Sequence, residues 1–202
     1  MKKLSLLFTK DGLQWHISKG KTVLEEAFHF VTEETSPHLV EEKLDDVLKF
    51  DDYKEIEVIS ALNHFSLTPD TFAEHELGYK LISYNAPVDE AYEELMLSVN
   101  KKFAVQFYYT FPKHFYQKIK AKKLPTKFNF SGEKFLNALT VKNHKEIHIN
   151  LYHHQVEFFA FENKKVILYN NLDADSEVDF LYFIMFSLSK INFGTAETHF
   201  HI

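Results

Sequence analysis

Cysteine is absent from the sequence. Disulfide bonds, thiolate catalysis and cysteine-ligated zinc are therefore excluded, and so is a partner held by a disulfide. Cysteine-free chains occur in every compartment, but this absence gives no support to a secreted, cross-linked fold.

Arginine is also missing, so all 23 basic residues are lysines. Arginine is the side chain that best recognises phosphate, carboxylate and guanine through paired hydrogen bonds. Its absence excludes an arginine finger from this chain and makes sequence-specific binding of nucleic acid an unfavoured function. Glycine is scarce as well, with 5 residues, although loops that cradle phosphate need it.

Long apolar runs are a third absence. The apolar stretch at the N-terminus ends at Lys10 and Asp11, too early for a signal-peptide core of about 7–15 residues. No stretch approaches the roughly 18 apolar residues that a membrane helix needs. We expect a cytoplasmic protein that does not insert into a membrane.

Aromatic residues are abundant, and charge is unevenly distributed. With 21 Phe and 10 Tyr, aromatic rings should dominate the core. The formal net charge is −6. Residues 1–100 hold 9 Lys and 20 acids, whereas residues 101–202 hold 14 Lys and 9 acids. The surface potential should therefore be polarised between the two halves of the chain.

Alternating apolar and polar residues predict three strands at the start of the chain. They lie between residues 4 and 31 and are separated by turn residues. Ser36 and Pro37 then predict the start of a helix, as its cap and its first residue. A fourth strand is expected at residues 55–60.

The same order of elements returns between residues 147 and 202. Three alternating segments are followed by a capping box at residues 176–179, and another alternating segment begins at Thr198. The helix that the capping box opens carries one apolar stripe, formed by Val178, Leu181, Met185 and Leu188.

A constant shift of 143 positions aligns the two copies. It places Leu6 on Ile149 and Trp15 on Phe158, and it brings both turns into register. Between the copies, further strands and helices are expected from residue 103 to 139, without a Gly/Ser-rich or Pro-rich linker. We therefore expect an internal repeat whose halves pack together.

This doubled β-β-β-α-β unit resembles the ribonuclease-H-like fold as it is duplicated in actin-like ATPases. Three motifs also resemble elements of one bacterial family of unknown function. They are a strand-Pro-helix element at residues 105–116, a strand at 166–172 followed by residues 177–183, and residues 65–72. The resemblance spans nearly the whole chain. It implies an α/β fold of the actin-like ATPase kind, similar to pilus-assembly and cell-division actin-like proteins, with no established activity.

The resemblance also implies how the chain is divided. Residues 1–143 should form the first ribonuclease-H-like domain, with additional strand and helix elements, and residues 144–202 the second. Family members usually continue beyond the strand at residues 199–202, so the second domain should be incomplete at its C-terminal end. The glycine-rich adenosine loop of the family plan would then lie beyond Ile202 or be missing.

The first turn of each half holds phosphate in an actin-like ATPase. The resemblance therefore points to Lys10, Asp11 and Gly12 as a turn for phosphate or magnesium. The equivalent turn of the second copy, residues 152–155, has neither an acid nor a glycine. The alternative interpretation of Lys10-Asp11-Gly12, and the favoured one, is an ordinary hairpin turn.

A ribonuclease-H-type nuclease is disfavoured, because it needs acids on central strands to hold two metal ions. The predicted first strand of each copy, residues 4–8 and 147–151, carries none. The acids of the second copy are expected at the surface or in caps instead, and they are Glu146, Glu157, Asp173 and Asp175.

Histidines invite a metal-site interpretation. Two of them, His199 and His201, share one strand face, and four more precede them at His144, His148, His153 and His154. If this segment is extended, however, the adjacent His153 and His154 point to opposite faces, which argues against a shared metal site. We interpret the set as exposed strand and turn histidines and expect no metal site.

A run of lysines without acids is the best candidate for a contact surface. It lies beside Phe115 and Tyr116 and consists of Lys113, Lys118, Lys120, Lys122, Lys123 and Lys127. An acidic protein surface or nucleic acid could bind there. The alternatives are a solvated helix face, or charge complementarity with acids of the first hundred residues such as Glu41 and Asp45.

The favoured function is therefore a non-catalytic, degenerate actin-like module that binds another protein or serves as a scaffold. No cofactor and no tight nucleotide binding are expected. The first alternative is a nucleotide-binding actin-like ATPase that uses Lys10, Asp11 and Gly12 to hold ATP and magnesium. The second alternative is nonspecific, lysine-mediated binding of nucleic acid.

Overall fold

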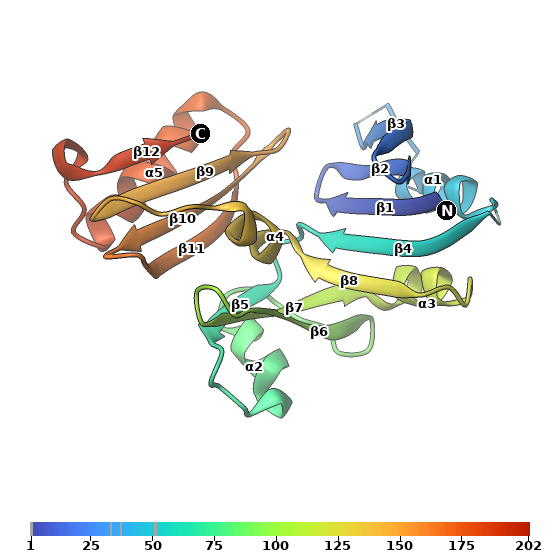
Figure 1. Cartoon of the computed structure of the whole chain (residues 1–202), viewed down its shortest axis with the longest axis horizontal. Helices are drawn as coiled ribbons and strands as arrows, with labels where there is room; N and C mark the ends of the chain where they lie inside the picture. The colour runs from blue at the N-terminus through green and yellow to red at the C-terminus, as the bar shows by residue number, and fades with distance from the viewer. Residues whose placement is uncertain (1, 33, 37, 51) are drawn as a thin grey trace.

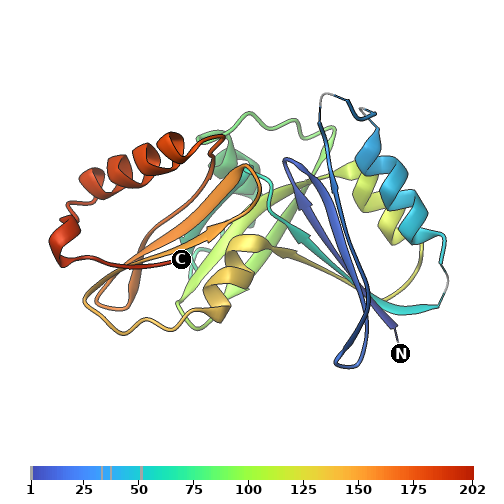
Figure 2. The same cartoon turned by 90° about the horizontal axis from the view of Figure 1, so that it is seen from above.

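Three β-sheets form the framework of the protein, as a computed structural model shows for residues 2–32, 34–36, 38–50 and 52–202 (Figure 1). The first sheet has strand order β3-β2-β1-β4-β8, the second β11-β10-β9-β12, and the central one β5-β7-β6. Figure 2 shows the first and second sheets facing each other, with helices on their outer sides.

The first sheet is built from the alternating segments of the first copy. Its strands are β1 (Lys2–Thr9), β2 (Gly12–Lys19), β3 (Thr22–Phe30), β4 (Tyr53–Ser60) and β8 (Thr126–Phe130). β4 and β8 run parallel to their neighbours, and the first three strands form an antiparallel meander. Leu4, Leu6 and Phe8 alternate along β1 toward the covered face, where all three are buried.

Helix α1 (Leu39–Leu48) covers this face through Leu44, Val47 and Leu48. The helix begins two residues later than its sequence suggests. The Ser36 hydroxyl accepts a hydrogen bond from the His38 backbone N–H, at 3.1 Å, just ahead of the helix. Pro37, the expected first helical residue, lies outside the described residues.

The second sheet repeats this plan. It contains β9 (Lys145–Leu151), β10 (Gln155–Glu162), β11 (Lys165–Asp173) and β12 (His199–His201), with α5 (Glu177–Lys190) packed on it. Ile147, Ile149 and Phe158 meet Ile184 and Leu188 of α5 in its core.

The predicted duplication is confirmed by the strand register as well as by the order of elements. Leu6 of β1 pairs with Trp15 of β2, and the residues 143 positions later, Ile149 and Phe158, pair in the same way. The final strand of each copy, β4 or β12, runs parallel to the first strand of its copy. The first sheet has β8 as a fifth strand, whereas the described part of the second sheet has four strands.

The central sheet and three helices join the two copies. They are β5 (Phe65–Pro69), β6 (Glu93–Asn100), β7 (Val105–Pro112), α2 (Gly78–Ser83), α3 (Lys113–Lys120) and α4 (Ser131–Ala138), with 3-10 turns at His75–Leu77 and Thr195–Glu197. Phe107 and Tyr109 of β7 pack with Phe130, Phe159 and Tyr169 in one aromatic cluster. Because this cluster draws on β7, β8, β10 and β11, the two copies share a core.

Candidate functional site

The β1–β2 turn and the β9–β10 turn, equivalent in the repeat, contact each other directly. The Asp11 carboxylate accepts hydrogen bonds from the backbone N–H of His154, at 2.9 Å, and from the ring Nδ1 of His154, at 3.3 Å. The side chain of Asp11 is 11% exposed. Phe30 adds a ring contact with His153, with centroids 4.7 Å apart.

Other polar groups of the two turns also bind across this junction. Lys10 Nζ lies 3.2 Å from a carboxylate oxygen of Asp173 and 3.4 Å from one of Asp175. The Gln155 amide donates to the Ala61 carbonyl and to Asn63 Oδ1, at 2.8 and 2.7 Å. The side chains of Lys10 and Asp11, which were predicted to bind phosphate or magnesium, are thus engaged in contacts within the protein.

The local backbone geometry requires a glycine at position 12. Its φ of +151° suits glycine, and a Cβ atom there would lie 2.0 Å from the His29 carbonyl oxygen in β3. The glycine therefore lets β2 and β3 approach each other closely. Lys10, Asp11 and Gly12 do lie together in one turn, as predicted, and the contacts of all three are explained by the fold.

A cavity of about 260 Å³ opens beside this turn. Its polar lining comes from Lys10, Asn63, His64, Glu93 and Thr110. The Glu93 carboxylate accepts hydrogen bonds from the Thr110 hydroxyl and the His64 ring. One lysine and one carboxylate give this lining little net charge, which does not favour a polyphosphate.

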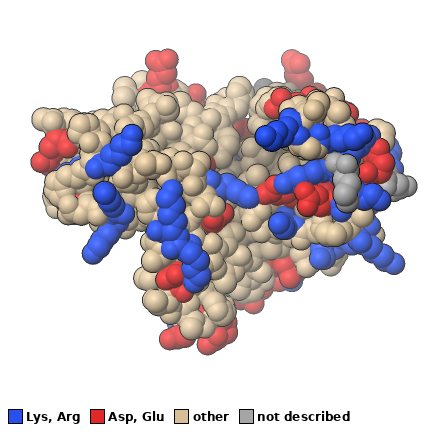
Figure 3. Space-filling model, in the orientation of Figure 1, with Lys and Arg blue, Asp and Glu red and all other residues tan. Residues whose placement is uncertain are grey.

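The lysines of the run at residues 113–127 differ in their contacts and in their exposure. Lys118 Nζ lies 2.9 Å from Glu41 and 2.8 Å from Asp45 of α1, as the alternative of internal complementarity expects. Hydrogen bonds from Lys118 to Asp45 and Glu41 raise the pKa of Lys118, and the same lysine lowers the pKa of Glu41. Lys113 donates to the Glu90 carbonyl. Over the first sheet and α3, Figure 3 shows lysines and acids side by side.

The two aromatic residues of that run belong to the core of the first sheet. Phe115 packs on Phe8, with ring centroids 5.3 Å apart, and Tyr116 packs on Phe128, at 5.1 Å. Lys120, Lys123 and Lys127 are exposed. Since Phe115 and Tyr116 are half-buried against neighbours of the same chain, the run offers charge at this surface but little apolar area.

Helix α5 presents an exposed apolar surface that its sequence pattern did not predict. Of the four residues expected on one stripe, Leu188 is buried, whereas Val178, Leu181 and Met185 are 74, 58 and 50% exposed. The predicted stripe is therefore divided, because Leu188 packs in the core with Ile184 whereas the other three residues are exposed. The hydrophobic periodicity could not show which face of α5 packs on the sheet, since the helix is apolar on both faces.

A groove runs between α5 and β11. Its volume is about 440 Å³, and its apolar lining comes from Leu168 and Leu172 of β11 and from Tyr182, Phe183 and Phe186 of α5. Tyr182 and Phe186 are 61 and 48% exposed, and their rings stack with centroids 5.9 Å apart. Among the described residues, β11 pairs only with β10, so its outer edge has no strand partner, although the Asn171 backbone N–H donates to Asn170 Oδ1 at 3.0 Å.

Two acids that the sequence placed at the surface or in caps are buried instead. Glu146 lies within β9, which begins earlier than predicted, and is 1% exposed. Glu157 of β10 is 0% exposed and accepts hydrogen bonds from four side chains: Ser131, Asn150, Tyr152 and Tyr169. Burial and this carboxylate together raise the pKa values of Tyr152 and Tyr169.

His148 is a third correction, because it is buried rather than exposed. Its ring Nε2 lies 2.7 Å from Glu146 Oε2. Burial disfavours the charged form of Glu146, but hydrogen bonds from the Asn143 and Lys142 amides and from His148 outweigh it and hold its pKa at about 2. Burial also lowers the pKa of His148, although Glu146 opposes that shift.

The duplicated sheets and their facing turns define an actin-like ATPase fold, and structural comparison agrees. A Bacteroides thetaiotaomicron protein described as having an actin-like ATPase fold and unknown function matches with a TM-score of 0.81 and 20% identity. The match covers 99% of this chain and 80% of that one. The chain belongs to the DUF3822 family of proteins of unknown function, whose sequence model matches residues 1–202.

A second similar structure is the PilM–PilN type IV pilus biogenesis complex. It matches with a TM-score of 0.50 and 11% identity, over 93% of this chain and 66% of that one. A comparison with curated proteins gave no match. In the described residues, no helix is long and apolar enough to cross a membrane.

Proposed function

We propose that this chain is a non-catalytic, protein-binding module with an actin-like fold. The observation that carries the proposal is the outer face of α5, where Val178, Leu181, Tyr182, Met185 and Phe186 are all about half exposed or more. Contiguous exposed apolar surface on a globular protein marks an interaction site more often than scattered apolar residues do.

The size of this surface suits a partner that also contacts β11. Full burial of one large apolar side chain contributes about 1.5–3 kcal/mol, so covering five half-exposed ones contributes on the order of 5 kcal/mol. Association itself costs about 4–15 kcal/mol, which the helix face alone would barely offset. The groove against Leu168 and Leu172 adds apolar area, and the edge of β11 adds backbone hydrogen bonds.

We therefore infer a partner segment in extended conformation. It would add a strand to β11 and place alternate apolar side chains in the groove against Tyr182 and Phe186. In this mode the backbone supplies hydrogen bonds and the groove supplies selectivity. A structure of similar fold occurs in the PilM–PilN complex, so a fold of this kind does serve in a protein assembly.

The junction of the two turns supports the non-catalytic part of the proposal. A nucleotide held between these turns would have to displace the contacts that Asp11 makes with His154 and that Lys10 makes with Asp173. We expect magnesium-ATP at millimolar concentration to leave the melting temperature unchanged. Saturation at about 100 times the dissociation constant would stabilise the chain by about 2.7 kcal/mol, which is readily detected.

The binding surface is tested by a matched pair of tyrosines. Tyr182 on α5 is 61% exposed, and Tyr92, just ahead of β6, is 73% exposed. We expect Tyr182→Glu to abolish recovery of the partner from cells of the source organism, while Tyr92→Glu recovers it as the unchanged chain does. Equal recovery by both variants would exclude α5 as the binding surface. A magnesium-dependent shift with ATP would instead favour the nucleotide-binding alternative.

A further inference from the structure

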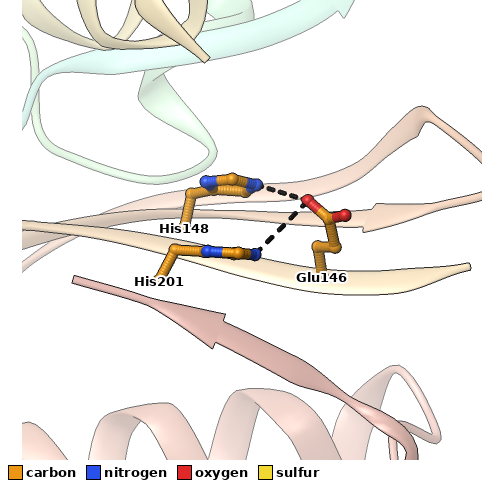
Figure 4. Close-up of side chains that lie close together, drawn as sticks. All are labelled: Glu146, His148 and His201. Atoms are coloured by element: carbon orange, nitrogen blue, oxygen red, sulfur yellow. Dashed lines mark hydrogen bonds and ion pairs between the residues drawn. The ribbon is translucent and has the colours of Figure 1, made fainter. Parts of the chain in front are cut away.

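We propose that Glu146, His148 and His201 bind a divalent transition-metal ion, and that Zn²⁺ is the ion their ligand atoms suit best. Figure 4 shows both imidazole rings directing a nitrogen toward the same carboxylate. Glu146 Oε2 lies 2.7 Å from His148 Nε2 and 3.6 Å from His201 Nε2. The three ligand atoms lie within 4.8 Å of one another.

The strand pairing places these residues on one face. Glu146 and His148 are two positions apart on β9, so their side chains project to the same side. β12 runs parallel to β9, with His201 in register with His148. The cluster therefore depends on a pairing between segments more than fifty residues apart, which the sequence pattern alone did not reveal.

The carboxylate and one imidazole are held in place before any ion binds. Glu146 Oε1 accepts hydrogen bonds from the backbone N–H groups of Lys142, at 2.7 Å, and Asn143, which leaves Oε2 to face the histidines. The His148 ring stands edge-on to Phe161 at 5.5 Å and stacks on His201 at 4.4 Å. Such surrounding contacts orient ligands and raise metal affinity.

The distances fit a tetrahedral zinc ion after small movements. Ligand atoms about 2.0–2.2 Å from tetrahedral Zn²⁺ lie roughly 3.4 Å from one another. Glu146 Oε2 and His148 Nε2 must separate slightly, with the imidazole proton on Nδ1, so that Nε2 can offer its lone pair. The His201 side chain is 47% exposed and can rotate toward the other two ligands.

Two nitrogens and one carboxylate oxygen form a ligand set that zinc accepts, whereas magnesium and calcium require mostly oxygen. Three protein ligands leave a fourth position for water. His199 pairs in register with Glu146, and its side chain projects to the same face of the sheet as the three ligands. It is therefore the neighbouring side chain on β12 that could replace this water as a fourth ligand. Bound zinc would hold the short strand β12 against β9.

The test uses the tag-free chain, stripped of metal with a chelator. It is titrated with Zn²⁺ against a colorimetric chelator and with Co²⁺, whose visible absorption reports tetrahedral nitrogen and oxygen ligands. We expect one ion per chain. His201→Ala removes an exposed ligand without disturbing the core and should weaken Zn²⁺ binding by more than about tenfold. His114→Ala, which removes an exposed histidine of α3, should bind as the unchanged chain does.

Glu146→Gln is the second variant, checked for folding by circular dichroism, and it should also weaken binding by more than about tenfold. Absence of Zn²⁺ binding, or equal affinity of His201→Ala and the unchanged chain, would overturn the proposal. The cluster would then be a hydrogen-bonded contact between β9 and β12. This site lies at the opposite edge of the second sheet from the α5–β11 groove, so its failure leaves the proposed function standing.

Discussion

Asp11 and His154 occupy equivalent positions of the two repeats, 143 residues apart, and are hydrogen-bonded to each other. In the plan of an actin-like ATPase these two turns hold phosphate. Here the acid of the first turn binds a backbone amide of the second. The two turns whose equivalence identifies the duplicated fold are therefore also a point of contact between its halves.

Removing the Asp11 side chain should destabilise the protein. Asp11→Ala leaves the His154 backbone N–H without its acceptor, which typically costs about 1–3 kcal/mol. Urea denaturation at pH 7 measures this loss. Asp175→Ala is the control, because Asp175 also pairs across the junction, with Lys10, but is 75% exposed. Little change is expected for that variant, and equal losses for both would refute the role assigned to Asp11.

Two glycines of the first sheet provide a matched test of the turn geometry. Gly12→Ala adds a Cβ at 2.0 Å from the His29 carbonyl, whereas Gly20, with φ of +63°, has no atom within 4 Å of the added carbon. We expect Gly20→Ala to cost about 1–2 kcal/mol from backbone strain. Gly12→Ala should cost about 1–3 kcal/mol more, from the clash. Melting temperatures of the two variants measure this difference. A lower melting temperature for Gly20→Ala than for Gly12→Ala would contradict the role assigned to Gly12.

The Glu57 carboxylate of β4 should contribute stability that depends on pH. Burial disfavours its charge, but Lys134 and Lys3, with Nζ atoms 2.5 and 2.6 Å away, hold its pKa below the usual value of 4.5. A lowered pKa in the folded state means that the contribution is full above pH 4.5 and is lost as the pH falls through the folded value.

Glu57→Gln should therefore be less stable than the unchanged chain by about 2 kcal/mol at pH 7. Urea denaturation at a series of pH values should show this difference shrinking below pH 4.5. Glu55→Gln serves as the control, since Glu55 is 50% exposed and lies 3.9 Å from Lys3. A difference for Glu57→Gln that stays constant from pH 7 to pH 3.5 would contradict the linkage.

The fold could be predicted from the sequence because its signals are local. Alternation marked the strands around Leu6 and Ile149, and the turns at Asp11 and His154 placed both copies in register. Those signals depend on residues a few positions apart. The family resemblance then supplied the topology, which the observed strand orders confirm.

Which side chains are buried and which are exposed was harder to predict, because burial depends on residues that are distant in the sequence. Glu157 is buried because Ser131 and Tyr169 reach it from α4 and β11, and no pattern around residue 157 reveals them. Phe115 packs on Phe8 across more than a hundred residues. The exposed side of α5 was missed because Val178 and Leu188 look alike in sequence, although only one of them faces the core.

The central claim, that α5 is a protein-binding surface, is tested most directly by site-specific photo-crosslinking in cells of the source organism. A photoreactive amino acid replaces Tyr182 in one variant and Tyr92 in another. We expect a discrete protein adduct from position 182 and none from position 92. An absence of adducts from position 182, or the same adducts from both positions, would contradict it.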